Sequence, residues 1–63
     1  MKLIRLPEAL AKTGLSRTRL YVLLAEQSFP QPVKLGANAR AIAFPENEID
    51  AWIADRIAER EAA

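Results

Sequence analysis

The sequence contains no cysteine and no histidine among its 63 residues. Without these side chains, disulfide bonds, thiolate nucleophiles and the usual zinc-binding sets are excluded. The lack of histidine also removes the side chain that most often acts as a general acid or base near neutral pH. No stretch approaches the ~20 apolar residues that a membrane-spanning helix requires. These absences argue against an enzyme, a metal site and a membrane protein.

The short length predicts a single domain over residues 1–63, with a tail that frays from about residue 61. A core of this size contributes only about 3–5 kcal/mol net, and it leaves no room for a deep pocket between two lobes. No signal peptide is recognisable, because no apolar stretch follows the first charged residues. We therefore expect a cytoplasmic protein.

The net charge of +1 hides an uneven distribution along the chain. Residues 1–45 carry seven basic and two acidic side chains, which is a net charge of +5. Residues 46–63 carry two basic and six acidic side chains, which is a net charge of −4. A basic body with an acidic C-terminal segment indicates an anionic partner for the body. Ordinary solubilising charge is the alternative interpretation.

Two short helices joined by a tight turn are predicted in the first half of the chain. The first spans about residues 7–13, with Pro7 at its first position and Gly14 just beyond its end. The second spans about residues 17–27 and follows Ser16, whose hydroxyl can cap its first turn. Because so few residues separate the two helices, they must cross steeply, as in a helix-turn-helix.

The second half predicts a short two-stranded hairpin and a third helix. Alternating residues at 33–35 and 42–44 indicate the strands, and residues 36–40 form a basic tip between them. The third helix is expected over about residues 46–60, with one apolar stripe that contains Ile49, Trp52, Ile53 and Ile57. The expected fold class is therefore α+β and mostly α. Its architecture is a winged helix-turn-helix with three helices and a hairpin between the second and third.

The second helix has an exposed face of unusual composition. Its leucines cluster on one side and must face the core: Leu20, Leu23 and Leu24. The opposite side carries small, apolar or aromatic residues flanked by arginines: Thr18, Tyr21, Val22, Ala25, Arg17 and Arg19. Small apolar side chains contact thymine methyls in a major groove, and arginine pairs with guanine. Arginines in a first turn oppose the helix dipole, a cost that duplex phosphates offset. The face predicts duplex DNA binding, with the hairpin beside the groove.

Several motifs of the chain occur together in one known family. They are "TGLSRT" at residues 13–18, "LY" at 20–21, "FPQPVKLG" at 29–36 and "IDAWI" at 49–53. In this combination the chain resembles the AlpA-type prophage regulators, small winged helix-turn-helix proteins related to excisionases and to the DNA-binding part of the MerR family. The resemblance covers roughly residues 3–60. It implies a sequence-specific, duplex DNA-binding transcriptional regulator that is prophage-associated and acts at the bacterial nucleoid. A DNA-bending, excisionase-like factor for site-specific recombination is the alternative within the family.

The resemblance also implies which residues contact DNA. The recognition-helix candidates are Ser16, Arg17, Thr18, Arg19 and Tyr21, and the wing candidates are Lys34 and Arg40. Phe44 and Trp52 are expected in the core. The chain departs from the family pattern at Gln27, where glycine is common. It also departs at the tip over residues 37–39, which often carries a second glycine and more basic residues.

A protein-interaction adaptor is the alternative from another functional class, because the acidic last helix offers a surface for a basic partner. An enzyme is not expected, since the carboxylates of that helix have ordinary surface spacing and no apolar pocket that would shift their pKa is implied. No cofactor, metal or small-molecule substrate is expected either. A module of this size buries only ~600–1,000 Å² on DNA, so a homodimer or a cooperative assembly on DNA is the expected binding form.

Overall fold

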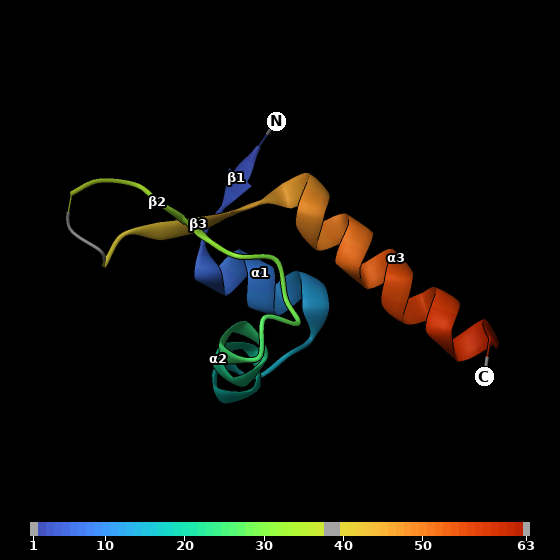
Figure 1. Cartoon of the computed structure of the whole chain (residues 1–63). Helices are drawn as coiled ribbons and strands as arrows, with labels where there is room; N and C mark the ends of the chain where they lie inside the picture. Colours follow the sequence, from blue (N-terminus) through green and yellow to red (C-terminus); the bar gives the residue numbers. More distant parts are fainter. Residues whose placement is uncertain (1, 38–39, 63) are drawn as a thin grey trace.

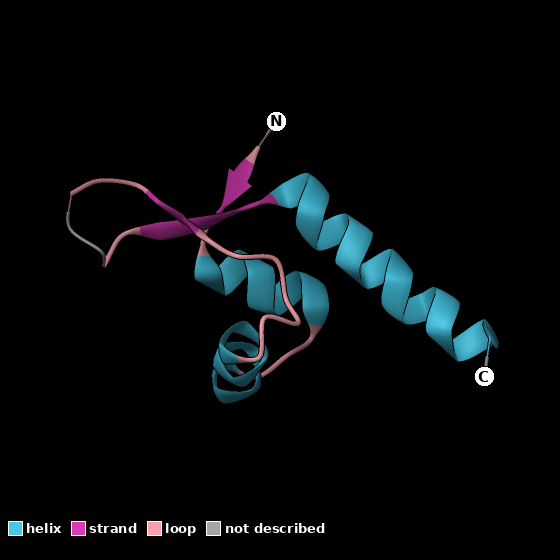
Figure 2. Cartoon of the chain, in the orientation of Figure 1, coloured by secondary structure: helices cyan, strands magenta, loops and turns pink. Residues whose placement is uncertain are grey.

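The computed structural model describes residues 2–37 and 40–62. Its elements follow in the order β1 (Leu3–Ile4), α1 (Leu6–Thr13), α2 (Arg17–Ala25), β2 (Val33–Lys34), β3 (Ile42–Pro45) and α3 (Glu46–Ala62). Three helices and one small antiparallel sheet confirm the expected α+β class, an arrangement consistent with a winged helix-turn-helix (Figures 1 and 2). The molecule is elongated, with extents of 42 × 25 × 19 Å. The hairpin lies toward one end and the C-terminal half of α3 toward the other (Figure 1).

The turn between α1 and α2 is built as the sequence predicts. Gly14 adopts a left-handed conformation with φ of 74°, and its N–H donates a 2.8 Å hydrogen bond to the carbonyl of Leu10. Two residues later, the hydroxyl oxygen of Ser16 accepts a 3.1 Å hydrogen bond from the N–H of Arg19. One bond closes the last turn of α1 and the other opens the first turn of α2. The two caps therefore fix where each helix stops and starts.

The end of α2 carries a left-handed residue that is not glycine. Gln27 has φ of 59°, and its N–H donates to the carbonyl of Leu24 over 3.0 Å. The N–H of Ser28 donates to the carbonyl of Leu23 over 2.9 Å. This pair of bonds is a Schellman motif, which ends a helix by wrapping the chain back over its last turn. The helix consequently ends at Ala25, two residues before the expected boundary.

The sheet has three strands in the order β1-β3-β2, all antiparallel. The expected hairpin is present as β2 and β3, with Lys34 opposite Ile42. Residues 38 and 39, in the middle of the predicted tip, lie outside the described residues. The sequence analysis did not predict the third strand, β1, which joins the sheet because Ile4 pairs with Phe44. A strand of two residues is too short to show an alternating pattern in the sequence.

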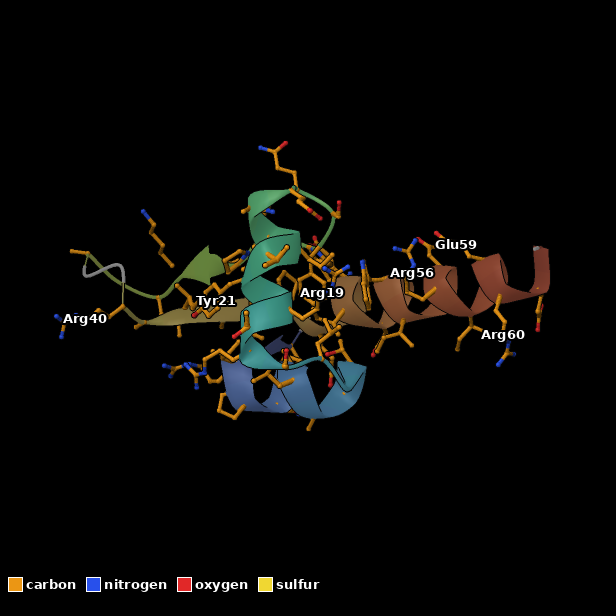
Figure 3. All side chains as sticks on the ribbon, turned by 90° about the horizontal axis from the view of Figure 1, so that it is seen from below. Arg19, Tyr21, Arg40, Arg56, Glu59 and Arg60 are labelled. Atoms are coloured by element: carbon orange, nitrogen blue, oxygen red, sulfur yellow. The ribbon has the colours of Figure 1, made fainter. Side chains whose placement is uncertain are left out.

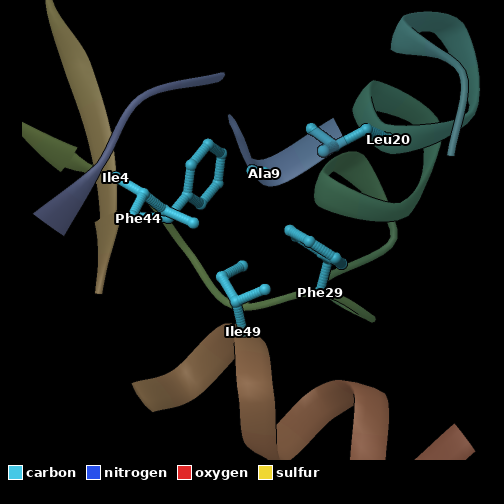
Figure 4. Close-up of a cluster of buried hydrophobic side chains, with 6 residues drawn as sticks. All are labelled: Ile4, Ala9, Leu20, Phe29, Phe44 and Ile49. Atoms are coloured by element: carbon cyan, nitrogen blue, oxygen red, sulfur yellow. The ribbon is translucent and has the colours of Figure 1, made fainter. Parts of the chain in front are cut away.

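One small core joins the sheet to the three helices (Figure 4). Its buried members are Ile4, Ala9, Leu20, Phe29, Phe44 and Ile49. The rings of Phe29 and Phe44 meet edge to face with centroids 5.8 Å apart. Phe44 is fully buried, which confirms its expected place in the core, and Trp52 packs against the cluster partly buried. The core therefore packs α2 against α1 and β3 and fixes the rotation of α2 about its own axis.

The apolar stripe of α3 extends farther than the core it faces. Ile49, in the first turn, is fully buried, whereas Ile57 is 48% exposed. The sequence predicts one apolar stripe on this helix, and its last member, Ile57, lies outside the core cluster. The reason is length: α3 has 17 residues, or about 26 Å, and projects past α1 and α2 (Figure 1). The helix also continues to Ala62, beyond its expected end at residue 60.

No helix in the part of the chain that the structure describes is long and apolar enough to cross a membrane.

Candidate nucleic-acid interface

The packing of its leucines determines which face α2 presents to the outside. Leu20 is fully buried, and Leu23 and Leu24 pack partly buried against the core, as predicted. The residues of the opposite side are all exposed: Arg17, Thr18, Arg19, Tyr21, Val22 and Ala25. The sequence-based orientation of α2 is therefore confirmed.

The centre of the exposed α2 face is narrow and uncharged. Thr18, Val22 and Ala25 follow one another at spacings of four and three residues, so they form one line along the helix. Val22 is 39% exposed, although valine is usually buried. Small side chains along this line leave the helix backbone accessible to a closely approaching partner.

The two arginines of α2 lie on opposite flanks of this face. Residues two positions apart do not share a side of a helix, so Arg17 and Arg19 diverge. Tyr21 is four residues after Arg17 and lies on the same flank, toward the hairpin. Figure 3 shows Arg19 and Tyr21 on opposite sides of α2, with Arg19 on the side of α3. The predicted recognition residues therefore do not form a single cluster.

A groove of about 580 Å³ separates the α2 flank from the hairpin. From α2 and the hairpin it is lined by Arg17, Tyr21, Arg40 and Ile42. The segment that starts α1 supplies the remaining lining residues: Arg5, Leu6 and Pro7. We call these seven residues the arginine groove. It brings together three of the residues that the sequence analysis names as DNA-binding candidates: Arg17, Tyr21 and Arg40.

Arg5 is a member of the groove that sequence reasoning missed. Its Nε donates a 3.1 Å hydrogen bond to the carbonyl of Ile42, 37 residues later in the chain. This contact exists because β1 pairs with β3, which brings the start of α1 beside the hairpin. The only sequence signal was a cation directly before a helix start, and this signal alone does not indicate a site.

The second wing candidate, Lys34, is placed differently from Arg40. Lys34 is exposed on β2 and is not among the residues that line the arginine groove. Of the two wing candidates, Arg40 therefore lines the arginine groove and Lys34 does not.

Ion pairs remove part of the positive charge from the other side of the body. The ammonium of Lys12 lies 2.7 Å from a carboxylate oxygen of Asp50 and 3.0 Å from one of Glu46. These hydrogen bonds, the one to Asp50 first, raise the pKa of Lys12 above its usual value of 10.5. Lys2 lies 3.9 Å from Glu8.

Within the described residues, the cations around α2 have no carboxylate partner of this kind: Arg5, Arg17, Arg19 and Lys34. Uncompensated positive charge is therefore concentrated around α2 and the hairpin. A polyanion is the partner that such a surface attracts.

Comparison with known proteins identifies related sequences. The family model described as "Prophage CP4-57 regulatory protein (AlpA)" matches residues 2–57. The chain is also similar to the uncharacterized protein ORF88 of Enterobacteria phage P4, with 39% identity over 59 residues. This alignment covers 94% of the chain but 65% of the phage protein, so the chain spans just under two thirds of that relative's length. No solved structure matches the chain significantly.

Proposed function

Because the chain belongs to the AlpA family of prophage regulatory proteins, we propose that it is a transcriptional regulator that binds duplex DNA sequence-specifically. The α2 helix enters the major groove in this proposal, and the hairpin lies against the adjacent backbone. The observation that carries the proposal is the exposed face of α2. It has an uncharged centre of small side chains and an arginine on each flank.

The two parts of the α2 face have different roles in the proposal. Thr18 and Val22, on the central line, approach base edges and thymine methyl groups. Arg19, on the flank toward α3, pairs with a base or a phosphate at the edge of the groove. Tyr21 donates its hydroxyl hydrogen to the backbone on the other flank. The phosphate contacts set the register of the helix, and the base contacts set the sequence.

Ser16 contributes through the start of α2. Its hydroxyl oxygen already accepts the N–H of Arg19, so its remaining role is to donate its own hydrogen. The first backbone N–H groups of a helix lack partners within the helix and carry a partial positive charge. A phosphate at this end therefore meets several donors at once.

Selection from random duplex DNA at ~0.15 M salt, followed by sequencing of the bound pool, tests the proposal. An enriched motif supports sequence-specific binding, and a two-fold symmetric motif indicates that two protomers bind. Adjacent repeats of one site would instead favour the excisionase-like role. Retention without a motif would contradict specific recognition, and no retention at all would contradict DNA binding.

Point variants connect the selected motif to α2. Arg19→Ala is expected to weaken binding of the selected duplex by ~1–3 kcal/mol and to relax specificity at one position of the motif. Arg60→Ala is the matched control, since it removes the same charge from an exposed position on α3. Binding of Arg19→Ala that equals that of Arg60→Ala would contradict the assignment of α2.

A further inference from the structure

The arginine groove contains more positive charge than α2 needs in order to contact bases. Three elements each contribute one arginine: Arg5 precedes α1, Arg17 begins α2, and Arg40 lies in the hairpin. No carboxylate is among its lining residues in the described part of the chain. Like charges that line one groove repel one another, and an anion bound between them removes that repulsion. The groove is therefore an anion site by its composition.

The shape of the groove favours a sugar–phosphate strand over a small free anion. Its volume of about 580 Å³ far exceeds what one phosphate fills. Its uncharged lining residues include Leu6, Pro7 and Ile42, which give it apolar surface between the arginines. A free phosphate gains nothing from contact with this apolar surface, because it has no carbon atoms to pack against it. The backbone of a nucleic acid alternates charged phosphates with sugars whose carbon faces pack on such residues.

Arg5 is oriented in advance for this role. Its Nε is used in the hydrogen bond to the carbonyl of Ile42, which holds the plane of the guanidinium against the hairpin. The two terminal nitrogens make no hydrogen bond within the described residues. These nitrogens are the pair that binds phosphate oxygens in a bidentate manner. The Arg5 side chain is therefore already ordered before DNA binds, so binding loses less conformational entropy.

We propose that the arginine groove binds one phosphodiester strand of duplex DNA through Arg5, Arg17 and Arg40, independently of sequence. This proposal rests on the proposed function, because the strand belongs to the duplex that α2 reads. Arg5 acts as a positioning residue in this arrangement. Its bond to Ile42 links the hairpin to the start of α1, so one bound strand sets the position of both beside α2.

Fluorescence anisotropy with labelled duplexes at several salt concentrations tests the groove. The selected duplex and a scrambled duplex are titrated with the wild type, with Arg5→Gln and with the control Lys2→Gln. We expect Arg5→Gln to bind both duplexes roughly tenfold more weakly, by the same factor on each. Its slope of log affinity against log salt should fall by about 0.9, the value expected when one phosphate is no longer neutralised.

The control Lys2→Gln removes the same charge close by in the sequence but outside the groove. It is expected to change the affinity less than twofold. Equal reductions in affinity for Lys2→Gln and Arg5→Gln would overturn the proposal that the groove binds a strand, because net charge alone would then explain the effect. A reduction confined to the selected duplex would also overturn it, since Arg5 would then read sequence.

Far-UV circular dichroism shows whether Arg5→Gln is folded, since this variant lacks the hydrogen bond to Ile42. If it is unfolded, Arg17→Gln gives the same test on a side chain without a described hydrogen bond to the rest of the fold. A folded Arg5→Gln that binds like the wild type would overturn the proposed strand contact but leave the function of α2 intact, because Arg5 is not part of α2. A folded Arg17→Gln that binds like the wild type would count against both the strand contact and the role of this flank of α2. A wild type that binds no duplex would overturn both.

Inorganic phosphate separates the two sources of the anion. At constant ionic strength, replacing chloride with phosphate should leave the difference between wild type and Arg5→Gln unchanged. If phosphate abolishes this difference, the groove is a free-anion site and the proposed strand contact is wrong.

Discussion

The indole N–H of Trp52 donates a 2.9 Å hydrogen bond to the backbone carbonyl of Ser28. The N–H of Ser28 closes the Schellman motif at the end of α2, so this bond joins α3 to that end. The ring of Trp52 also packs edge to face against Phe29, with centroids 4.9 Å apart. The guanidinium of Arg56 lies over the same ring, 5.2 Å from its centroid. Trp52 therefore links α3 to the segment that directly follows α2.

Trp52→Phe keeps a ring beside Phe29 but removes the hydrogen bond to Ser28. We expect the free energy of unfolding to fall by about 1 kcal/mol, the usual net value of one hydrogen bond. Urea denaturation followed by far-UV circular dichroism measures it, because the variant contains no tryptophan. The control Arg56→Gln removes the charge over the ring, which contributes about 0.5 kcal/mol at an exposed site, and with it the ion pair between Arg56 and Glu59. A Trp52→Phe variant as stable as the wild type would show that the hydrogen bond contributes nothing.

Gln27→Gly should stabilise the protein. Gln27 has φ of 59°, a conformation that costs a side chain with Cβ about 1 kcal/mol and costs glycine little. The variant should therefore gain about 1 kcal/mol in thermal or urea denaturation. Gly14→Ala is the opposite case: its added Cβ would meet no atom within 4 Å, but φ of 74° should make it about 1 kcal/mol less stable. A fall in the stability of Gln27→Gly would contradict this account of the α2 terminus.

Two substitutions at Ser16 separate the capping of α2 from its contact with DNA. Ser16→Ala removes the oxygen that accepts the N–H of Arg19 and should lower the free energy of unfolding by about 1 kcal/mol. Ser16→Asp keeps a capping oxygen, so its stability should stay near that of the wild type. Its carboxylate nevertheless repels phosphate, and duplex binding should weaken for selected and scrambled sequences alike. Unchanged duplex binding by a stable Ser16→Asp would place the phosphate away from this end of α2.

The ion pairs of Lys12 predict a decrease in stability at alkaline pH. Hydrogen bonds to Asp50 and Glu46 raise the pKa of Lys12 above 10.5 in the folded protein. The stabilisation is therefore fully present below pH 10.5, the value of the unfolded chain, and disappears as the pH rises through the higher folded value. Lys12→Met should accordingly be less stable than the wild type at pH 8, and the difference should shrink above pH 10.5. A difference that stays constant across this range would show that these ion pairs do not stabilise the fold.

Local signals in the sequence predicted the helix-turn-helix correctly. The glycine at residue 14 and the serine at residue 16 act through bonds to residues three or four positions away. The three leucines of α2 similarly set its orientation by spacing alone. Each of these features depends on chemistry within one helical turn, so one short stretch of sequence is sufficient to predict it.

Contacts between distant segments could not be predicted in the same way. The bond from Arg5 to Ile42 needs the pairing of β1 with β3, and a two-residue strand leaves no periodic pattern. The exposure of Ile57 depends on where the body of the molecule ends beneath α3, which the spacing of apolar residues does not encode. The groove was missed for the first of these reasons, although two of its arginines were already DNA-binding candidates.

The order of the strands in the sheet restricts how this chain folds while it is being synthesised. Leu3 pairs with Pro45, so the first strand is made about 40 residues before its partner. At 5–20 residues per second this delay is roughly 2–8 s. During that time α1 and α2 are already made, but Phe44 and Ile49, which complete their core, are missing. The domain should therefore close in one late event, and a chain released before residue 50 should stay unfolded and open to proteolysis.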